Sequence, residues 1–152
     1  MFLIALRDDI VYNDIPVAKQ LIDNYSKYSS SIVGCQEVKE VDVSKYRIIK
    51  SSKSLDEKTV EMVDFIEKSS IEEAPSKLAC LERYLLTSKI FEYVEKTELG
   101  KDREVIVAMM NDRVKILTYN FNGRKYDVGN KFGLLKANIE FGVDKRGTIR
   151  VS

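Results

Sequence analysis

Residues 123–140 read GRKYDVGNKFGLLKANIE and form the most distinctive arrangement in the chain. A short polar strand ends in Asp127, and a helix is expected to open at Lys131 and to run to about Phe141. This order places a carboxylate beside a helix N-terminus at one edge of a fold. Such an edge suits a metal ion and an anionic ligand.

The residues before this stretch predict a β-hairpin. Residues 114–121 alternate apolar and polar side chains, which is the pattern of a half-buried strand. Asn122 and Gly123 form a strong two-residue turn signal, so residues 124–127 are expected to pair back on the preceding strand.

The chain opens with a β-α-β pattern. An apolar strand, residues 2–6, runs into Arg7 and the acids Asp8 and Asp9. A helix over residues 17–28 and a second buried strand, residues 31–38, follow, and this order favours a parallel pair. Acids at the carboxyl end of a strand lie where ligands bind in open α/β sheets.

The middle of the chain predicts further strands at residues 46–50, 60–67 and 78–86, with a surface loop at 51–58. Thr87 is expected to cap a helix with Ile90, Phe91 and Val94 on its apolar face, and a second helix is expected near residues 104–111. These elements predict a mixed α/β sheet covered by helices.

Composition restricts the class of protein. The chain has 152 residues, of which 44% are hydrophobic and 32% charged, as expected for one globular domain. Its 25 basic and 24 acidic residues give a net charge of +1, which provides no field to attract nucleic acid. No apolar run is long enough to span a bilayer, and the first residues lack a basic leader, so a cytoplasmic location without membrane contact is expected.

The sequence contains no histidine, which excludes Ser-His and Cys-His nucleophiles and His-ligated zinc. Any chemistry must use carboxylates, lysines and oxygen-ligated metal ions. Cys35 and Cys80 lie in apolar runs, where a thiol usually behaves as a small buried hydrophobe; a reactive thiol is the alternative.

Two sets of charged residues are candidates for a site. Asp8, Asp9 and Asp127 could bind Mg²⁺ together with water and phosphate oxygens, or could be solvated turn residues. Glu67 and Lys68 could bind a sugar hydroxyl and a phosphate, or could form an exposed ion pair. The chain has no Gly-rich loop followed by a basic residue that would hold a triphosphate.

The chain resembles the bacterial UTP–glucose-1-phosphate uridylyltransferases of the sugar nucleotidyltransferase family. The resemblance covers about residues 2–143 and rests on six segments in order: LIALRDDIV, DNYSKYSSSIVGCQEV, VSKYRIIK, VDFIEK, EEAPSKLACLERYLLTSKIFEYVEKT and FNGRKYDVGNKFGLLKANIEFG. It implies a Rossmann-like mixed sheet flanked by helices, in a truncated nucleotidyltransferase fold. Residues 1–143 would be the sugar-side part of that domain, and residues 144–152 a C-terminal tail.

The resemblance also implies roles for the candidate residues. Family members convert UTP and glucose 1-phosphate to UDP-glucose and pyrophosphate. Asp8 and Asp127 match the acids that bind the catalytic Mg²⁺, and Glu67 and Lys68 match the pair that contacts the sugar and its phosphate. Metal and lysine would neutralise the charge that develops in an in-line attack of one phosphate on another.

Several positions depart from the family pattern. The family's N-terminal nucleotide-binding half would precede Met1, so this half is expected to be missing. Arg47 stands at the glycine of a Tyr-Gly motif, Glu82 at the glycine before Arg-Tyr, and Ser69 at the proline after Glu-Lys. Arg47 places a long cation where the family's backbone must closely approach the ligand. We therefore expect a chain that is inactive alone and does not bind UDP-glucose.

Two other roles remain open. The chain could be a non-catalytic interaction protein that self-associates, or that binds and modulates a complete uridylyltransferase. Alternatively, another polypeptide could supply the nucleotide-binding half and complete a split enzyme.

Overall fold

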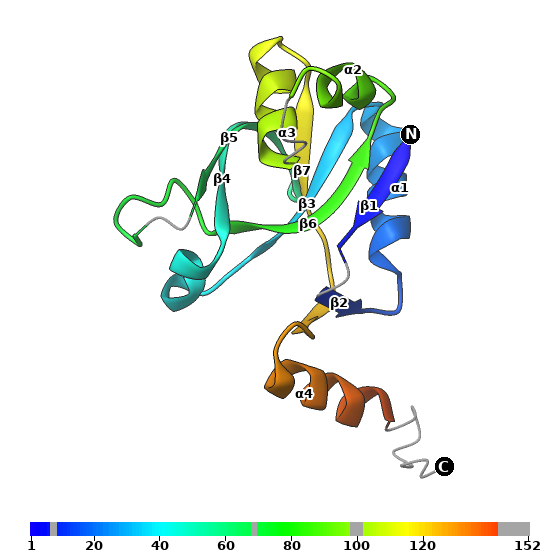
Figure 1. Cartoon of the computed structure of the whole chain (residues 1–152), viewed down its shortest axis with the longest axis vertical. Coiled ribbons are helices and arrows are strands. Elements are labelled where there is room, and N and C mark those ends of the chain that lie inside the picture. Colours follow the sequence, from blue (N-terminus) through cyan, green and yellow to red (C-terminus); the bar gives the residue numbers. More distant parts are fainter. Residues whose placement is uncertain (7–8, 68–69, 98–101, 143–152) are drawn as a thin grey trace.

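The structure of the chain is a computed structural model that describes residues 1–6, 9–67, 70–97 and 102–142 (Figure 1). Its elements in chain order are β1 (Phe2–Ala5), β2 (Asp9–Tyr12), α1 (Val17–Tyr28), β3 (Ser31–Glu37), the 3₁₀ turn η1 (Glu40–Lys45), β4 (Arg47–Ser54), β5 (Thr59–Glu67), β6 (Leu78–Leu86), α2 (Ile90–Val94), α3 (Asp102–Asn111), β7 (Ile116–Asn120), β8 (Arg124–Asp127) and α4 (Lys131–Gly142).

Six strands form a mixed sheet in the order β1-β6-β3-β7-β5-β4. β3 and β7 run parallel, and the other ordered neighbours are antiparallel. β4 also reaches back to β6 through the pairing of Ile48 with Ala79. The fold class predicted from the sequence, a mixed α/β sheet flanked by helices, is confirmed.

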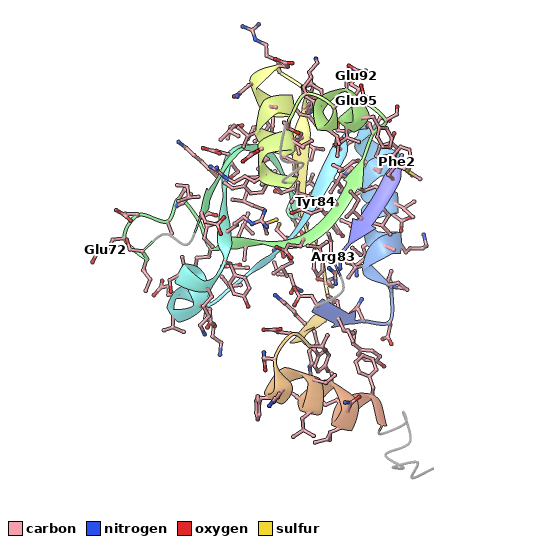
Figure 2. The ribbon with its side chains drawn as sticks, in the orientation of Figure 1. Phe2, Glu72, Arg83, Tyr84, Glu92 and Glu95 are labelled. Atoms are coloured by element: carbon pink, nitrogen blue, oxygen red, sulfur yellow. The ribbon has the colours of Figure 1, made fainter. Side chains whose placement is uncertain are left out.

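The core lies on both faces of this sheet because successive strand residues point to opposite sides. Ile32 and Leu117 pack with Leu21 of α1 on one face. Their neighbours Val33 and Ile116 pack on the other face, where α2 and α3 contribute Ile90, Tyr93, Val105, Ile106 and Met109. Tyr84 is among the largest buried side chains and lies in the interior (Figure 2). Because both faces of the sheet are covered, β3 and β6 are buried along most of their length.

The predicted parallel pair of the first two strands is wrong. β6 lies between β1 and β3 and pairs antiparallel with each of them. β1 and β3 therefore run in the same direction without being neighbours. The β-α-β pattern indicated their relative direction, but it contained no information about a strand almost fifty residues further along the chain.

The predicted hairpin is also wrong. β8 does not pair with β7; it pairs with β2, a strand that the sequence analysis missed, in a separate two-stranded sheet. Gln20 and Gln36 bind the backbone between the two strands: Gln20 Oε1 accepts from the Asn122 N–H, and Gln36 Nε2 donates to the Gly123 carbonyl oxygen. These bonds hold residues 121–123 as a connection between two sheets.

Smaller differences concern the ends of elements. β5 and β6 match their predicted ranges closely, but β4 extends to Ser54 through residues that were expected to form a loop. In α2, Ile90 is buried as predicted, whereas Phe91 and Val94 are 50% and 42% exposed and Tyr93 is buried in their place. The predicted tail, residues 144–152, lies outside the described residues.

α4 extends away from the main sheet beside the β2–β8 ribbon (Figure 1). Glu140 accepts hydrogen bonds from Tyr126 and Arg124 of β8, and these bonds lower the pKa of its carboxyl. Phe141 packs against the rings of Tyr12 and Tyr126 at centroid distances of 5.5 Å. Side chains of both ribbon strands therefore hold the last turns of α4.

The first turns of α4 need a glycine. A Cβ at Gly133 would overlap the carbonyl oxygen of Asp127, whereas a Cβ at Gly142 would meet nothing within 4 Å. Backbone atoms cannot move aside as a flexible side chain can, so the start of α4 can approach β8 this closely only with glycine at position 133.

We expect Gly133→Ala to weaken the docking of α4 by about 1–3 kcal/mol, the usual range for overpacking. Gly142→Ala is the matched control, because it makes the same change in the same helix without the clash. Hydrogen exchange of the α4 amides should speed up in Gly133→Ala and stay the same or slow in Gly142→Ala. Equal exchange in both variants would contradict the close approach.

Candidate functional site

A polar pocket of about 440 Å³ lies where the β2–β8 ribbon meets the main sheet. Seven of its nine lining residues are charged: Asp9, Lys45, Arg47, Glu67, Glu82, Lys125 and Asp127; the other two are Tyr46 and Cys80. They come from β2, β4, β5, β6, β8, η1 and the residue that follows η1. The pocket thus joins residues that are far apart in the sequence.

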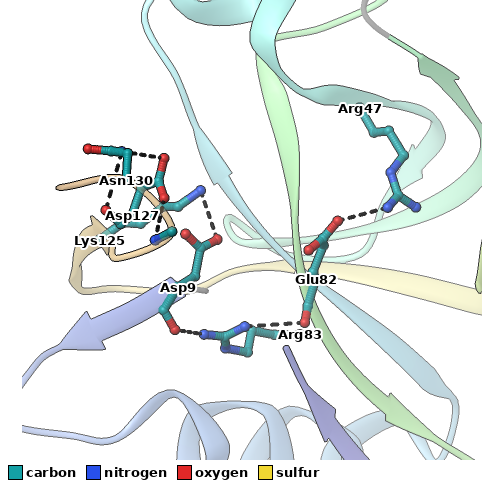
Figure 3. A network of polar contacts seen from close by, with 8 residues as sticks. Asp9, Arg47, Glu82, Arg83, Lys125, Asp127 and Asn130 are labelled. Carbon is teal, nitrogen blue, oxygen red and sulfur yellow. Dashed lines mark hydrogen bonds and ion pairs between the residues drawn. The ribbon is translucent and has the colours of Figure 1, made fainter. Parts of the chain in front are cut away.

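The ribbon places two acids opposite each other, because Asp9 and Asp127 are register partners in β2 and β8. Lys125 Nζ lies 2.9 Å from Asp9 Oδ2, and the two side chains are only 18% and 15% exposed (Figure 3). The ammonium group also lies 4.6 Å from the centroid of the Tyr46 ring. Lys125 therefore provides the positive charge that a divalent cation would otherwise bring to Asp9.

Asp127 organises the turn into α4. Its Oδ1 accepts from the Gly129 N–H at 3.0 Å, and its Oδ2 accepts from Asn130 Nδ2 at 2.9 Å (Figure 3). Asn130 Oδ1 in turn accepts from the Gly133 N–H at 2.7 Å and caps the helix. The predicted carboxylate beside a helix start is confirmed, but local donors already bind both of its oxygens.

A second charge cluster lies on the main-sheet side of the pocket. Arg47 Nη2 donates to Glu82 Oε1 at 2.8 Å, and Arg47 Nε lies 3.7 Å from Glu67 Oε2. The Arg47 side chain is 16% exposed, compared with 31% for Glu82 and 54% for Glu67. The shorter and less exposed contact, Arg47 with Glu82, is the stronger of the two.

Glu82 has an unusual backbone conformation for a strand residue. Its φ is +53°, in the left-handed region that glycine tolerates and other residues adopt at a cost of roughly 1–2 kcal/mol. The ion pair with Arg47 offsets part of this cost. The two positions at which the family resemblance expects glycine are therefore occupied by partners of one ion pair.

The structure brings together only part of the predicted site. Asp9, Glu67 and Asp127 line the same pocket. Asp8 and Lys68 lie outside the described residues. Among the residues that are described, no three His, Cys, Asp or Glu side chains gather as metal ligands. The carboxylates of Asp9 and Asp127 are chemically suited to Mg²⁺, but Lys125 already neutralises Asp9.

The sequence analysis missed Lys125. Its period-2 relation to Asp127 places both side chains on one face of a strand, and this signal was available. The contact with Asp9 was not predictable, because it depends on the unexpected pairing of β8 with β2.

The thiols of Cys35 and Cys80 are buried, as predicted, and neither cysteine is in a disulfide. Cys35 and Cys80 are register partners on β3 and β6. Burial, followed by the nearby Cys80, raises the pKa of the Cys35 thiol to about 12, so it is not a thiolate near neutral pH.

Comparison with known proteins finds relatives that are similar to this chain over most of its length. No protein-family model matches the chain. UTP–glucose-1-phosphate uridylyltransferase 1 of Staphylococcus saprophyticus is 38% identical over 144 residues, which are 92% of this chain and 50% of the relative. The chain is homologous to about half of this uridylyltransferase.

Solved structures agree with the uridylyltransferase homology. A UDP-glucose pyrophosphorylase complexed with UDP-glucose is 36% identical, with a TM-score of 0.77 over 92% of this chain and 55% of that one. A UTP-bound UGPase from Acinetobacter baumannii is 27% identical, with a TM-score of 0.86 over 96% of this chain and 53% of that one. The chain spans about half the length of the relatives it matches. No helix among the described residues is long and apolar enough to cross a membrane.

The positive φ of Glu82 predicts that Glu82→Gly is more stable than Glu82→Ala, which reverses the usual order of glycine and alanine in a strand. Glycine usually destabilises a strand by about 0.5–1 kcal/mol relative to alanine. At position 82 both variants lose the ion pair, but only alanine keeps the left-handed strain, so Glu82→Gly should unfold at higher urea concentration than Glu82→Ala. At Lys50, an exposed residue of β4, alanine should be the more stable variant. If Glu82→Ala unfolded at a higher urea concentration than Glu82→Gly, the result would contradict a strained backbone at position 82.

Proposed function

We propose that residues 1–152 form the sugar-side half of a uridylyltransferase-like protein and that they catalyse no UDP-glucose synthesis by themselves. The observation that carries this proposal is the state of the pocket: five of its seven charged groups pair with each other. Lys125 pairs with Asp9, and Arg47 pairs with Glu82 and Glu67. A substrate would have to separate these pairs before it could bind.

Separating them is unfavourable. In the family, Glu67 and Lys68 would hold the sugar and its phosphate, but Glu67 lies beside the Arg47 guanidinium. Lys125 and Asp9 are only 18% and 15% exposed, and removing one partner from such a pair leaves the other charge without compensation. Arg47 and Glu82 also add side chains where the resemblance expects glycines that let the ligand approach the backbone. Electrostatics and shape thus both oppose the family substrate.

Mg²⁺ would bind more weakly here than at an open pair of acids. By resemblance, Asp8 and Asp127 would hold the ion, which would neutralise phosphate charge when bound. The ammonium group of Lys125 is 2.9 Å from Asp9, across the ribbon from Asp127, and repels a divalent cation. Asp127 would therefore be the main protein ligand among the described residues, completed by water and phosphate oxygens.

Residues 1–152 should produce no detectable pyrophosphate from UTP, glucose 1-phosphate and Mg²⁺ in a coupled assay. Calorimetry with UDP-glucose and Mg²⁺ should give no binding heat. An intact uridylyltransferase, measured in parallel, is the positive control. Turnover at the rate of that enzyme would sink the proposal.

The double variant Arg47→Gly, Glu82→Gly tests the reason for inactivity. If the ion pair blocks the sugar side, removing both of its charges together should allow UDP-glucose to bind measurably. Neither partner of the Arg47–Glu82 pair is then left alone, and Glu67, which also loses Arg47, is 54% exposed and stays solvated. Lys19→Gly, Asp23→Gly removes an exposed ion pair on α1 and is the matched control. A double variant that binds no better than the unchanged chain would show that the missing contacts lie elsewhere.

One surface supports completion by a further segment. β1 pairs only with β6 among the described strands, so its other edge is open. Phe2, Leu3 and Ile4 are 44%, 44% and 39% exposed, although they belong to an apolar strand (Figure 2). An open apolar edge can accept another strand. A nucleotide-binding segment, in the same chain or in another, would bury this edge.

The exposed face of α4 supports a second role, self-association. Phe132, Leu135 and Ile139 are 78%, 56% and 58% exposed and share one face of the helix at spacings of three and four residues. Among the α4 residues whose burial is described, only Ala137 is buried. A contiguous apolar helix face of this kind favours a protein partner, and we assign a second copy of the chain.

Leu135→Lys should shift the chain from dimer to monomer in analytical ultracentrifugation, because it places a charge in the apolar face. Val41→Lys is the matched control: Val41 is 71% exposed on η1, far along the chain from α4, and its replacement should leave the mass unchanged. A monomeric parent chain would refute self-association. Binding of that monomer to an intact uridylyltransferase would favour the modulator role.

A further inference from the structure

A cavity of about 300 Å³ lies between β1, β2 and α1. Seven of its nine lining residues are apolar and come from these three elements, and the other two are charged. Leu21 is fully buried at the floor of the cavity, whereas Leu3 and Ile10 are 44% and 39% exposed and lie at its rim. The cavity is therefore an apolar site that opens to solvent. Its volume is at the lower end of the range of about 300–1,000 Å³ that is typical of small-molecule sites.

One cation, the guanidinium group of Arg83, borders this apolar space. Arg83 lies on β6 and is 8% exposed (Figure 2). Its Nη1 donates to the Glu82 carbonyl oxygen at 3.3 Å, and its Nη2 donates to the Asp9 carbonyl oxygen (Figure 3). Carbonyl groups carry no net charge, and no carboxylate of the described residues forms an ion pair with this guanidinium. Burying a charge without a partner of opposite charge is unfavourable.

The Arg83 guanidinium keeps donors for a ligand. Arginine has five N–H donors, and the two bonds to carbonyl oxygens leave three of them, including Nε–H, without an acceptor among the described residues. In that part of the chain, Asn24 Oδ1 is the one side-chain nitrogen or oxygen that is both closed to solvent and unpaired. Arg83 Nε is therefore not closed to solvent. Because Arg83 lines this cavity and not the charged pocket, a ligand in the cavity has a donor to bind.

The two acids nearest to Arg83 have cationic partners of their own. Asp9 lines both this cavity and the charged pocket, but its carboxylate pairs with Lys125, which lines only the charged pocket of the two. The Glu82 carboxylate accepts from Arg47 at 2.8 Å. Among the described lining residues, Arg83 is thus the charged group of this cavity whose charge is not matched.

These features favour an anion with an apolar body. One guanidinium group matches one negative charge, and its planar donors fit the two oxygens of a carboxylate. A phosphate group carries a charge of about −1.5 to −2 at neutral pH, and its excess charge would find no partner here. Hydroxyl groups on the body of the ligand would be buried against apolar side chains without hydrogen bonds, which is unfavourable.

We propose that this cavity binds a small monocarboxylate with an aliphatic chain of medium length. The carboxylate pairs with Arg83, and the chain lies between β1, β2 and α1 on the apolar lining. Binding of this kind is independent of UDP-glucose or Mg²⁺ binding at the charged pocket, and it goes beyond the function proposed above.

Two-dimensional ¹H–¹⁵N NMR of residues 1–152 tests the proposal, with acetate, butanoate, hexanoate and octanoate as probes. Octanoate should shift the backbone amides of Leu3, Ala18 and Leu21 and the Nε–H of Arg83 in a saturable manner. Affinity should rise about fourfold for each CH₂ group that becomes buried, equivalent to about 0.8 kcal/mol. Octyl phosphate should bind more weakly than octanoate, and 1-octanol, which lacks the charge, should bind at least about tenfold more weakly.

Four outcomes of this titration would overturn the proposal. They are the absence of a saturable shift with octanoate, equal binding of 1-octanol, tighter binding of octyl phosphate, and shifts confined to α4. The last result would show that the chain of the probe adheres to exposed apolar surface.

Arg83→Met should abolish the preference for octanoate over 1-octanol, whereas Arg83→Lys keeps the charge and should retain a preference. The ratio of the two affinities isolates the charge, because a loosened cavity weakens both ligands alike. Arg103→Met makes the same change at an exposed residue of α3 and should leave the ratio unchanged. A full preference for octanoate in Arg83→Met would overturn the proposal.

Ala18→Phe tests the cavity without changing Arg83, whose replacement by methionine also removes its bonds to two carbonyl oxygens. Ala18 is half-buried on α1 and lines the cavity, so a phenyl ring there occupies the space of the ligand. Octanoate should bind at least about tenfold more weakly, equivalent to about 1.4 kcal/mol. Ser26→Phe adds a ring at an exposed position of the same helix and should leave binding unchanged. Unchanged octanoate binding by Ala18→Phe would place the ligand elsewhere and overturn the proposal.

Discussion

The pairing of β2 with β8 is the contact on which the charged pocket and the position of α4 both depend. It joins residues more than a hundred positions apart and sets Asp9 opposite Asp127. Arg83 of β6, which is 8% exposed, donates to the Asp9 carbonyl oxygen and ties this ribbon to the main sheet (Figure 3). The close approach of Gly133 to Asp127 then fixes the start of α4. One small sheet therefore positions the acids, their lysine partner and the helix.

Burial decides what the charges of the pocket can do. Lys125 and Asp9 are both mostly buried, so their attraction is less screened than that of exposed pairs such as Lys19 with Asp23, which are 65% and 58% exposed. A pocket in which five of seven charged groups already pair with each other is less available to a charged ligand than an open set of charges. Homology to half of a uridylyltransferase is compatible with this state, because the fold can persist while the ligand contacts change.

The chain has two kinds of unfinished surface, and they point to different partners. The open edge of β1 offers backbone hydrogen bonds as well as apolar side chains, which suits another strand. α4 offers mainly apolar side chains, because most backbone groups of a helix are hydrogen-bonded within it, and this suits the packing of a second copy.

The sequence by itself determined the class of fold and the extent of most elements, because period-2 and helical patterns are local consequences of burial. β5, β6, α3 and α4 lie close to their expected ranges, and three of the proposed site residues, Asp9, Glu67 and Asp127, line one pocket. Only the tertiary structure decided which strands pair. Asn122 and Gly123 signal a turn, but parallel pairing with β3 and antiparallel pairing with β5 hold β7 in the main sheet and leave β8 to β2. Lys125 and the Arg47–Glu82 pair could not be placed beforehand for the same reason: their partners are chosen by long-range packing, which no local pattern encodes.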